Sequence, residues 1–181
     1  MDWSRYPGSD PADPHGVADL LGRACLEVSS TAVEGTRFLF STSQMLQVSR
    51  EIEQTSLVQP GTPLFVGVQH AYRLDEQADV YTSLVAAGLT VHAFGVDEGT
   101  LLPGINWIQV PVAPHSLGAS WFLVRDGEEP HALVGFELSP DDLDRRWEGF
   151  ETRDPALVQG ILHYLKDLAR ERLSKPDGES L

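Results

Sequence analysis

Apolar segments and amphipathic segments alternate through the first half of the chain, and this alternation constrains the fold more than any other feature. Apolar runs with strand character occupy Thr36–Ser41, Leu64–Gln69 and Leu89–Val96. Between them, Ser43–Leu57 and Asp75–Ala87 carry apolar side chains at helical spacing. Because the second and third runs are apolar on both faces, they resemble central strands that are covered on both sides. The order strand, helix, strand, helix, strand predicts a parallel core with right-handed crossovers.

The second half of the chain indicates further strands and a long final helix. The expected elements are a strand at Asn106–Val112, a hairpin of Trp121–Arg125 and His131–Leu138, a short helical turn from Ser139 to Trp147 and a helix from Asp154 to Leu173. Pro111 limits the first of these to a sheet edge or a strand end. We therefore predict one three-layer-like α/β domain. Its mixed sheet has about six strands, βαβαβ followed by antiparallel strands, with flanking helices.

The two ends of the chain have the composition of loose segments. Residues 1–15 are rich in Pro, Asp, Gly and Ser and are expected to be flexible. A first helix is predicted at His15–Ser29, where Cys25 lies on the apolar arc. The ordered domain is expected to span residues 16–173, followed by a disordered tail at 174–181. We find no internal repeat and no domain linker.

Composition excludes several classes of function. The formal net charge of −14 opposes binding to nucleic-acid phosphates and to anionic membranes. With a single cysteine, the chain cannot form an internal disulfide or a cysteine metal cluster. No stretch approaches 18 consecutive apolar residues, and the N-terminus lacks the pattern of a signal peptide. We therefore expect a cytoplasmic protein that contacts neither nucleic acid nor membrane.

No complete catalytic or cofactor motif is present. The six histidines show no metal-ligand spacing, and neither GxGxxG nor a P-loop occurs, so the sequence names no metal and no cofactor. The strand-to-helix junction at Ser41-Thr42-Ser43 carries hydroxyls but lacks the glycines of a nucleophile elbow. N-capping is the ordinary role of such hydroxyls. One alternative stays open, a small hydrolase or transferase using Ser41 or Ser43 with His70 or His92.

The helix predicted at Ser43–Leu57 places polar side chains on its apolar face. At about 100° per residue, Ser49, Glu53 and Ser56 fall inside an arc formed by Met45, Leu46, Val48, Ile52 and Leu57. A carboxylate in a core-facing stripe is costly unless it is paired or hydrogen-bonded. Glu53 is therefore either exposed at the edge of the stripe or held in a structural pair, or it lies at the floor of a pocket with Ser49 one turn away.

Polar and aromatic residues also gather at the ends of the apolar strands. Gln69 and His70 end one strand, with Tyr72 just beyond, Phe94 ends the next, and Trp121 begins a later one. The carboxyl ends of strands in open α/β sheets border the crevice where ligands bind. These residues predict a pocket. Alternatively, Gln69 and His70 cap their strand end and bond to loop backbone.

Several of these segments together resemble a known family, the DICT sensory domain found with diguanylate cyclases and two-component systems. The segments that carry the resemblance are Ser49-Arg-Glu-Ile-Glu53, the strand ending Val68-Gln69, Tyr72, the helix with Tyr81 and Leu84, the strand ending Phe94-Gly95, Trp121, and Arg146-Trp-Glu-Gly-Phe-Glu-Thr-Arg-Asp154. The likeness extends over about Thr36 to Ala169. It implies a sensory input domain that binds a small ligand or relays a partner's signal. Since no GGDEF, kinase or helix-turn-helix pattern accompanies it, we expect action in trans on a cyclase, a kinase or a transcription regulator.

These observations lead to one main hypothesis, a non-enzymatic sensory domain with a ligand pocket. The segment Trp147–Thr152 either anchors the final helix or forms a lid or partner-contact surface beside Glu53. A protein-interaction module without a pocket is the remaining alternative. The expected ligand-binding residues are Ser49, Glu53, Gln69, His70, Tyr72, Phe94, Trp121, Trp147, Glu148 and Thr152.

Overall fold

The computed structural model describes residues 39–59, 61–100, 102–110, 117–137 and 145–174. The flexible segment expected at 1–15, the helix expected at His15–Ser29, the start of the turn expected at Ser139 and nearly all of the tail expected at 174–181 lie outside the described residues.

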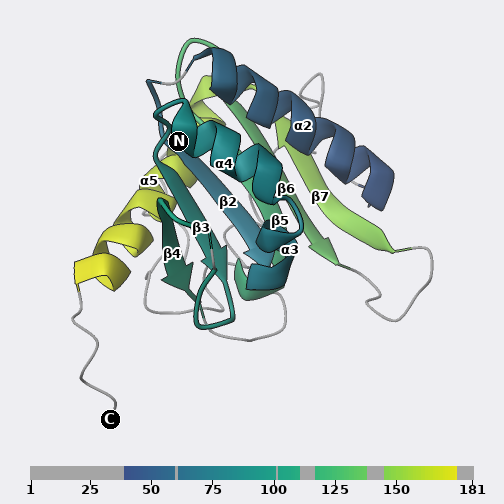
Figure 1. The fold of residues 1–181 in the computed structure, drawn as a ribbon. Helices are drawn as coiled ribbons and strands as arrows, with labels where there is room; N and C mark the ends of the chain where they lie inside the picture. The colour runs from purple at the N-terminus through teal and green to yellow at the C-terminus, as the bar shows by residue number, and fades with distance from the viewer. Residues whose placement is uncertain (1–38, 60, 101, 111–116, 138–144, 175–181) are drawn as a thin grey trace.

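The described chain forms a seven-stranded mixed sheet with helices on both faces (Figure 1). The strands are β1 (Leu39–Ser41), β2 (Leu64–Gln69), β3 (Val91–Gly95), β4 (Ile105–Gln109), β5 (Ser120–Arg125), β6 (His131–Glu137) and β7 (Arg146–Thr152). The helices are α2 (Thr42–Val58), α3 (Ala71–Asp75), α4 (Ala78–Ala86) and α5 (Pro155–Ser174), with a 3-10 turn, η2, at Leu117–Ala119. The predicted α/β class with a mixed sheet is confirmed.

The strand order is β1-β7-β6-β5-β2-β3-β4. Strands β2, β3 and β4 are parallel, and the remaining pairs are antiparallel. The edge position predicted for the strand near Pro111 is confirmed, because β4 is the last strand of the order. Its direction differs from the expectation, since β4 pairs parallel to β3 although no helix lies between them.

Local side-chain chemistry explains where α2 begins. The Ser41 hydroxyl accepts a hydrogen bond from the backbone N–H of Gln44, and the Gln44 side chain accepts one from the backbone N–H of Ser41. This reciprocal capping box satisfies two donors at the start of the helix. The N-capping role predicted for the hydroxyls of the strand-to-helix junction is therefore confirmed for Ser41.

The helix predicted at Asp75–Ala87 is observed as α4 at Ala78–Ala86, while a separate short helix, α3, ends at Asp75 where the predicted helix begins. No proline or glycine marks the break in the sequence. Instead, the turn is held by the side chain of Gln77, which donates to the backbone oxygen of Arg73 and accepts from the Arg50 guanidinium of α2. These hydrogen bonds fix the break between α3 and α4, so the observed helix begins three residues later than predicted.

The helical turn predicted to reach Trp147 is wrong at its C-terminal end. Arg146–Thr152 is strand β7, which lies between β1 and β6. Its side chains alternate between the two faces, with Trp147 in one core and Phe150 in the other. The segment is therefore part of the sheet rather than a lid.

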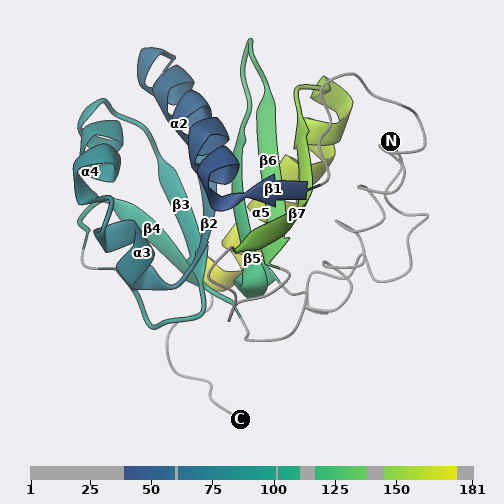
Figure 2. The ribbon, with the colours of Figure 1, turned by 90° about the vertical axis from the view of Figure 1, so that its right-hand side faces the viewer.

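Two separate cores lie on the two faces of the sheet. Figures 1 and 2 show α2, α3 and α4 on one face and α5 on the opposite face. The α5 face is packed with apolar side chains such as Phe122, Val134 and Leu162. On the α2 face, Met45 lies directly on Gly135, where a Cβ would come within 2.6 Å of its methyl carbon. The missing side chain lets the first turns of α2 approach the sheet closely.

Candidate functional site

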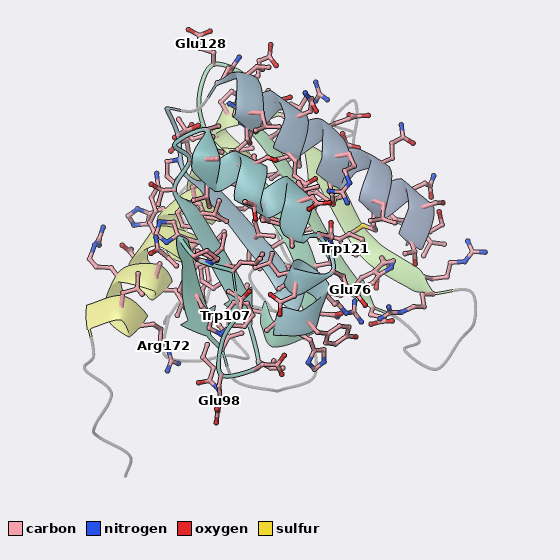
Figure 3. All side chains as sticks on the ribbon, viewed as in Figure 1. Glu76, Glu98, Trp107, Trp121, Glu128 and Arg172 are labelled. Carbon is pink, nitrogen blue, oxygen red and sulfur yellow. The ribbon has the colours of Figure 1, made fainter. Side chains whose placement is uncertain are left out.

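A pocket of about 330 Å³ opens on the α2 face, between α2 on one side and α3 and α4 on the other. It lies at the carboxyl end of β2, where the sequence predicts a ligand crevice. Figure 3 shows two of its residues, Trp121 and Glu76, in the same region between α2 and α3. The residues that line the pocket are Thr42, Leu46, Ser49, Glu53, Val68, Tyr72, Arg73, Glu76, Gln77, Tyr81, Trp121 and Arg145.

One stripe of α2 forms the first wall. Thr42, Leu46, Ser49 and Glu53 follow each other at intervals of four, three and four residues, so they share one face of the helix. This stripe includes Ser49 and Glu53, two of the three polar residues that the helical wheel places within the apolar arc, whereas Ser56 does not line the pocket. The sequence pattern therefore located one wall of the pocket.

Glu53 is both a pocket residue and a member of a structural pair. Its side chain is 3% exposed, and it accepts hydrogen bonds from Arg50 Nη1 at 2.6 Å and from the Tyr81 hydroxyl at 3.1 Å. Burial raises the pKa of Glu53, although the charge and hydrogen bond of Arg50 and the hydrogen bond of Tyr81 oppose the shift. Burial and the neighbouring carboxylate also raise the pKa of Tyr81 well above its ordinary value. Glu53 is thus held in a structural pair and also lines the pocket, so both alternatives considered for it apply.

Ser49 lies one turn before Glu53 and is 3% exposed. Its hydroxyl oxygen is buried and makes no hydrogen bond within the part of the chain that the structure describes. The hydroxyl of Ser56, also on the buried face, donates instead to the backbone oxygen of Ile52. Ser49 therefore differs from an ordinary buried helix serine in keeping an unused donor and acceptor beside the pocket.

The floor is an aromatic stack. Trp121 of β5 lies in the pocket lining, and its ring meets the ring of Trp147 edge to face, with the centroids 5.3 Å apart. Trp147 is fully buried, and its indole N–H donates to Thr42 Oγ1 at 3.3 Å. Trp147 thus supports the floor from below without lining the pocket itself.

Two guanidinium groups and a phenol ring lie on the remaining lining. Tyr72 is 53% exposed, and Arg73 donates to its hydroxyl at 3.3 Å. Arg145 lies over the ring of Trp147, at 5.4 Å from its centroid, and forms an ion pair with Glu137. Burial alone would raise the pKa of Glu137, but its bonds to Arg145 and Gln69 and the positive charges around it lower the pKa below the ordinary value.

Sequence reasoning missed several lining residues. Leu46 was assigned to the apolar arc, and the two arginines were not considered. Arg73 follows Tyr72 directly, but Arg145 reaches the pocket only because β7 packs beside β6. No local pattern around Arg145 signals this placement.

Two predicted residues at the end of β2 adjoin the pocket without lining it. The Gln69 side-chain amide donates to Glu137 at 3.5 Å, and Glu137 in turn pairs with Arg145 of the lining. His70 Nδ1 lies 3.2 Å from a carboxylate oxygen of Asp97, and its ring stacks against Tyr72. These side-chain contacts are to the carboxylates of Glu137 and Asp97, whereas the alternative expects bonds to loop backbone.

Three predicted residues lie on the α5 face, which the sheet separates from the pocket. Phe94 belongs to the α5 core. Glu148 is exposed opposite Phe136, and Thr152 accepts a hydrogen bond from the backbone N–H of Asp154. Because side chains alternate along a strand, residues with the parity of Phe150 point away from α2. The structure does not bring Phe94, Glu148 and Thr152 together with Glu53.

The hydroxyls and imidazoles of the hydrolase alternative have other partners. The hydroxyls of Ser41 and Ser43 contact each other at 2.9 Å. His92 stacks against Phe65 on the α5 face, and burial lowers its pKa. Among the described residues, no hydrogen bond joins either hydroxyl to an imidazole of His70 or His92.

Two other kinds of site were sought. In the described ranges, no three His, Cys, Asp or Glu side chains come together in a way that could hold a metal ion. None of the helices that the structure describes combines the length and the apolar character needed to cross a lipid bilayer.

The model of one protein family matches residues 24–137, a span that contains every lining residue of the pocket except Arg145. The family is DICT, described as the sensory domain in diguanylate cyclases and two-component systems. This chain belongs to the DICT family. The resemblance inferred from the sequence is confirmed, although the match ends before the Arg146–Asp154 segment.

Curated proteins and solved structures give no further information on the function of the chain. No curated protein matches the chain. Among solved structures, NucT from Helicobacter pylori is similar at 9% identity and a TM-score of 0.45, with 76% of this chain and 97% of that chain covered.

Proposed function

We propose that this DICT domain is a non-catalytic sensor that binds a small ligand in the pocket between α2, α3 and α4. The domain then signals whether the pocket is occupied to a partner such as a cyclase, a kinase or a transcription regulator. The single observation that carries this proposal is the polar chemistry held at the buried wall, where Ser49 keeps an unused hydroxyl beside the carboxylate of Glu53.

The energetic cost of this wall supports a ligand-binding role. A buried polar group without a partner costs about 1–3 kcal/mol, and a buried carboxylate is costly even when it is paired. Apolar side chains at both positions would give a better-packed helix face. A ligand that bonds to Ser49 and Glu53 would recover part of the cost.

The position of α3 supports a relay. This short helix carries Tyr72 and Arg73 and begins two residues after Gln69, a residue with a positive φ of 63°. A residue other than glycine in this conformation stores about 1–3 kcal/mol of strain. A ligand that contacts Tyr72 and Arg73 therefore acts on an element whose connection to the sheet is strained, and α3 is a natural place for a shift between two positions.

Native mass spectrometry of protein purified gently from its own host tests the occupancy of this pocket. The wild-type chain should carry a discrete non-covalent mass that is lost on denaturation. Leu46→Trp places a bulky ring in the lining and should lower the bound fraction. Leu173→Trp is the matched control, because Leu173 is also an exposed helical leucine but lies on α5.

Two outcomes would count against the proposal. Equal occupancy in both variants would place the ligand elsewhere on the molecule. A ligand-free mass that comes with a stoichiometric partner protein would favour the interaction module instead.

A further inference from the structure

The chemistry of the lining narrows the ligand to one class. We propose that the pocket takes a planar aromatic carboxylate whose acid group binds Arg73 and Arg145. The ring of this ligand contacts Tyr72 and Trp121, and a hydrogen-bond donor on its far side faces Glu53. This inference rests on the proposed ligand-binding function and assigns a chemical class to the ligand of the same pocket.

Arg73 supplies a positive charge without a bound carboxylate. Its Nε donates to the Tyr72 hydroxyl, and its guanidinium carbon lies 5.9 Å from the centroid of that ring. Within the described residues, Arg73 forms no ion pair at 4.0 Å or less. A guanidinium whose terminal nitrogens make no hydrogen bond to the described residues can bind an anionic ligand locally, even though the net charge of −14 repels anions at long range.

Arg145 offers donors that its ion pair does not use. Its Nε donates to Glu137, whereas its two terminal nitrogens make no hydrogen bond in the described part of the chain. A guanidinium can hold a carboxylate through two parallel N–H donors. The negative charge on the opposite wall is already offset, because Glu53 is paired with Arg50. Glu76 also lines the pocket and balances the charge of Arg73, so the preference for an acid rests on the unused N–H donors of Arg73 and Arg145 rather than on a net positive charge.

The aromatic lining and the volume set the shape of the ligand. Tyr72 and Trp121 both line the pocket, and aromatic side chains pack well against planar rings. A volume of about 330 Å³ is close to the lower limit of about 300 Å³ for small-molecule sites. This favours one ring or two fused rings over a whole nucleotide.

The acceptor groups on the buried wall favour a ligand that carries a hydrogen-bond donor. The carboxylate of Glu53 accepts two hydrogen bonds and retains further lone pairs, and the hydroxyl of Ser49 can accept as well as donate. A ring N–H or hydroxyl on the side away from the acid group would satisfy them. An acid at one end and a donor at the other fix the orientation of the ring.

A matched series of probes tests this class on the full chain. Indole-3-acetate, indole-3-acetamide and tryptamine share the fused indole ring system and its N–H donor. Their side chains are anionic, neutral and cationic, respectively. Calorimetry or ligand-observed NMR should rank the acid about tenfold tighter than the amide, with the amine weakest. Arg73→Gln should remove most of this preference. Arg153→Gln should keep it, because Arg153 is an exposed arginine that pairs with Glu51 and does not line the pocket.

Each other outcome has a distinct meaning. Equal binding of acid and amide, or tighter binding of the amine, would overturn the carboxylate class while leaving the pocket in use. Tighter binding of adenosine monophosphate than of the indole acid would overturn the size argument. If mass spectrometry showed a host-derived ligand but no indole compound bound, the aromatic carboxylate class would be rejected and the ligand-binding function would stand. Absence of both would reject the class and the proposed function together.

Discussion

The two faces of the sheet use the same strands for different purposes. On the α5 face, one long helix covers a continuous apolar surface. On the α2 face, three helices share the cover, and polar groups such as Ser49, Glu53 and Arg125 are buried among apolar ones. The pocket opens where α2 separates from α3 and α4. The comparison indicates that the α5 face is packed for stability, whereas the α2 face buries polar groups that cost stability beside the pocket.

Truncating the α5 core should have the largest effect. Leu162 is fully buried there, so Leu162→Ala should lower the free energy of unfolding by about 2–5 kcal/mol. Leu173→Ala, at a position 54% exposed on the same helix, should change it by less than about 0.5 kcal/mol. Urea titration measures both variants. If the folded molecules of Leu162→Ala also bound the ligand more weakly than the wild-type protein, the two faces would not have separate roles.

The strained residue at the end of β2 should give the next largest effect. Gln69→Gly and Gln69→Ala both remove the amide that contacts Glu137, but only glycine adopts a φ of 63° without a steric penalty. We expect the glycine variant to be more stable than the alanine variant by about 1–2 kcal/mol in chemical denaturation. Equal stabilities would show that the backbone of the variants relaxes out of the left-handed region, and α3 would then be free of the strain assigned to it.

Removing the unused hydroxyl should produce a smaller change of the opposite sign. Ser49→Ala eliminates a buried oxygen without a partner and introduces a better helix former, so we expect the unfolding free energy to rise by about 0.5–1 kcal/mol. The same variant should bind the ligand more weakly. Ser56→Ala provides the contrast, because the hydroxyl of Ser56 already donates to Ile52 and its loss should bring no comparable gain. A loss of stability in Ser49→Ala would mean that its hydroxyl is satisfied in solution.

Local patterns predicted the elements well and the site only in part. The segment that forms α2 was predicted from its helical periodicity, and β2 and β3 were predicted from continuous apolar runs, because both strands are buried on the two faces of the sheet. Trp147 and Phe150 are three residues apart, a spacing that also suits a helix, and only the pairing of β7 with β6 and β1 reveals the strand. Strand identity here depends on partners that are distant in sequence.

The same reason limited the prediction of the pocket. Ser49 and Glu53 were found because polar residues in an apolar stripe are a local anomaly. Phe94 was placed with them on the assumption that every residue at a strand end faces the crevice, but its parity along β3 turns it to the α5 face. Arg145 joins the lining through sheet order alone.

The pH dependence of Glu53 should be the smallest of these effects, because Arg50 and Tyr81 oppose the influence of burial. Its pKa is raised in the folded protein, so between the ordinary value of 4.5 and the raised value the folded state holds more protons than the unfolded chain. The contribution of Glu53 to stability is therefore fully present below 4.5 and is lost as the pH rises through the raised pKa.

Comparison with Glu53→Gln isolates this contribution. The stability of the wild-type protein relative to the variant should fall as the pH rises above 4.5 and then level off. Asp97 and Glu137, whose pKa values are lowered, act in the opposite direction, but they are present in both proteins and cancel. Urea denaturation of both proteins over a series of pH values measures the difference. If the difference instead grew with pH, the ion pair with Arg50 would outweigh burial, and the wall of the pocket would be stabilised by its charge rather than strained by it.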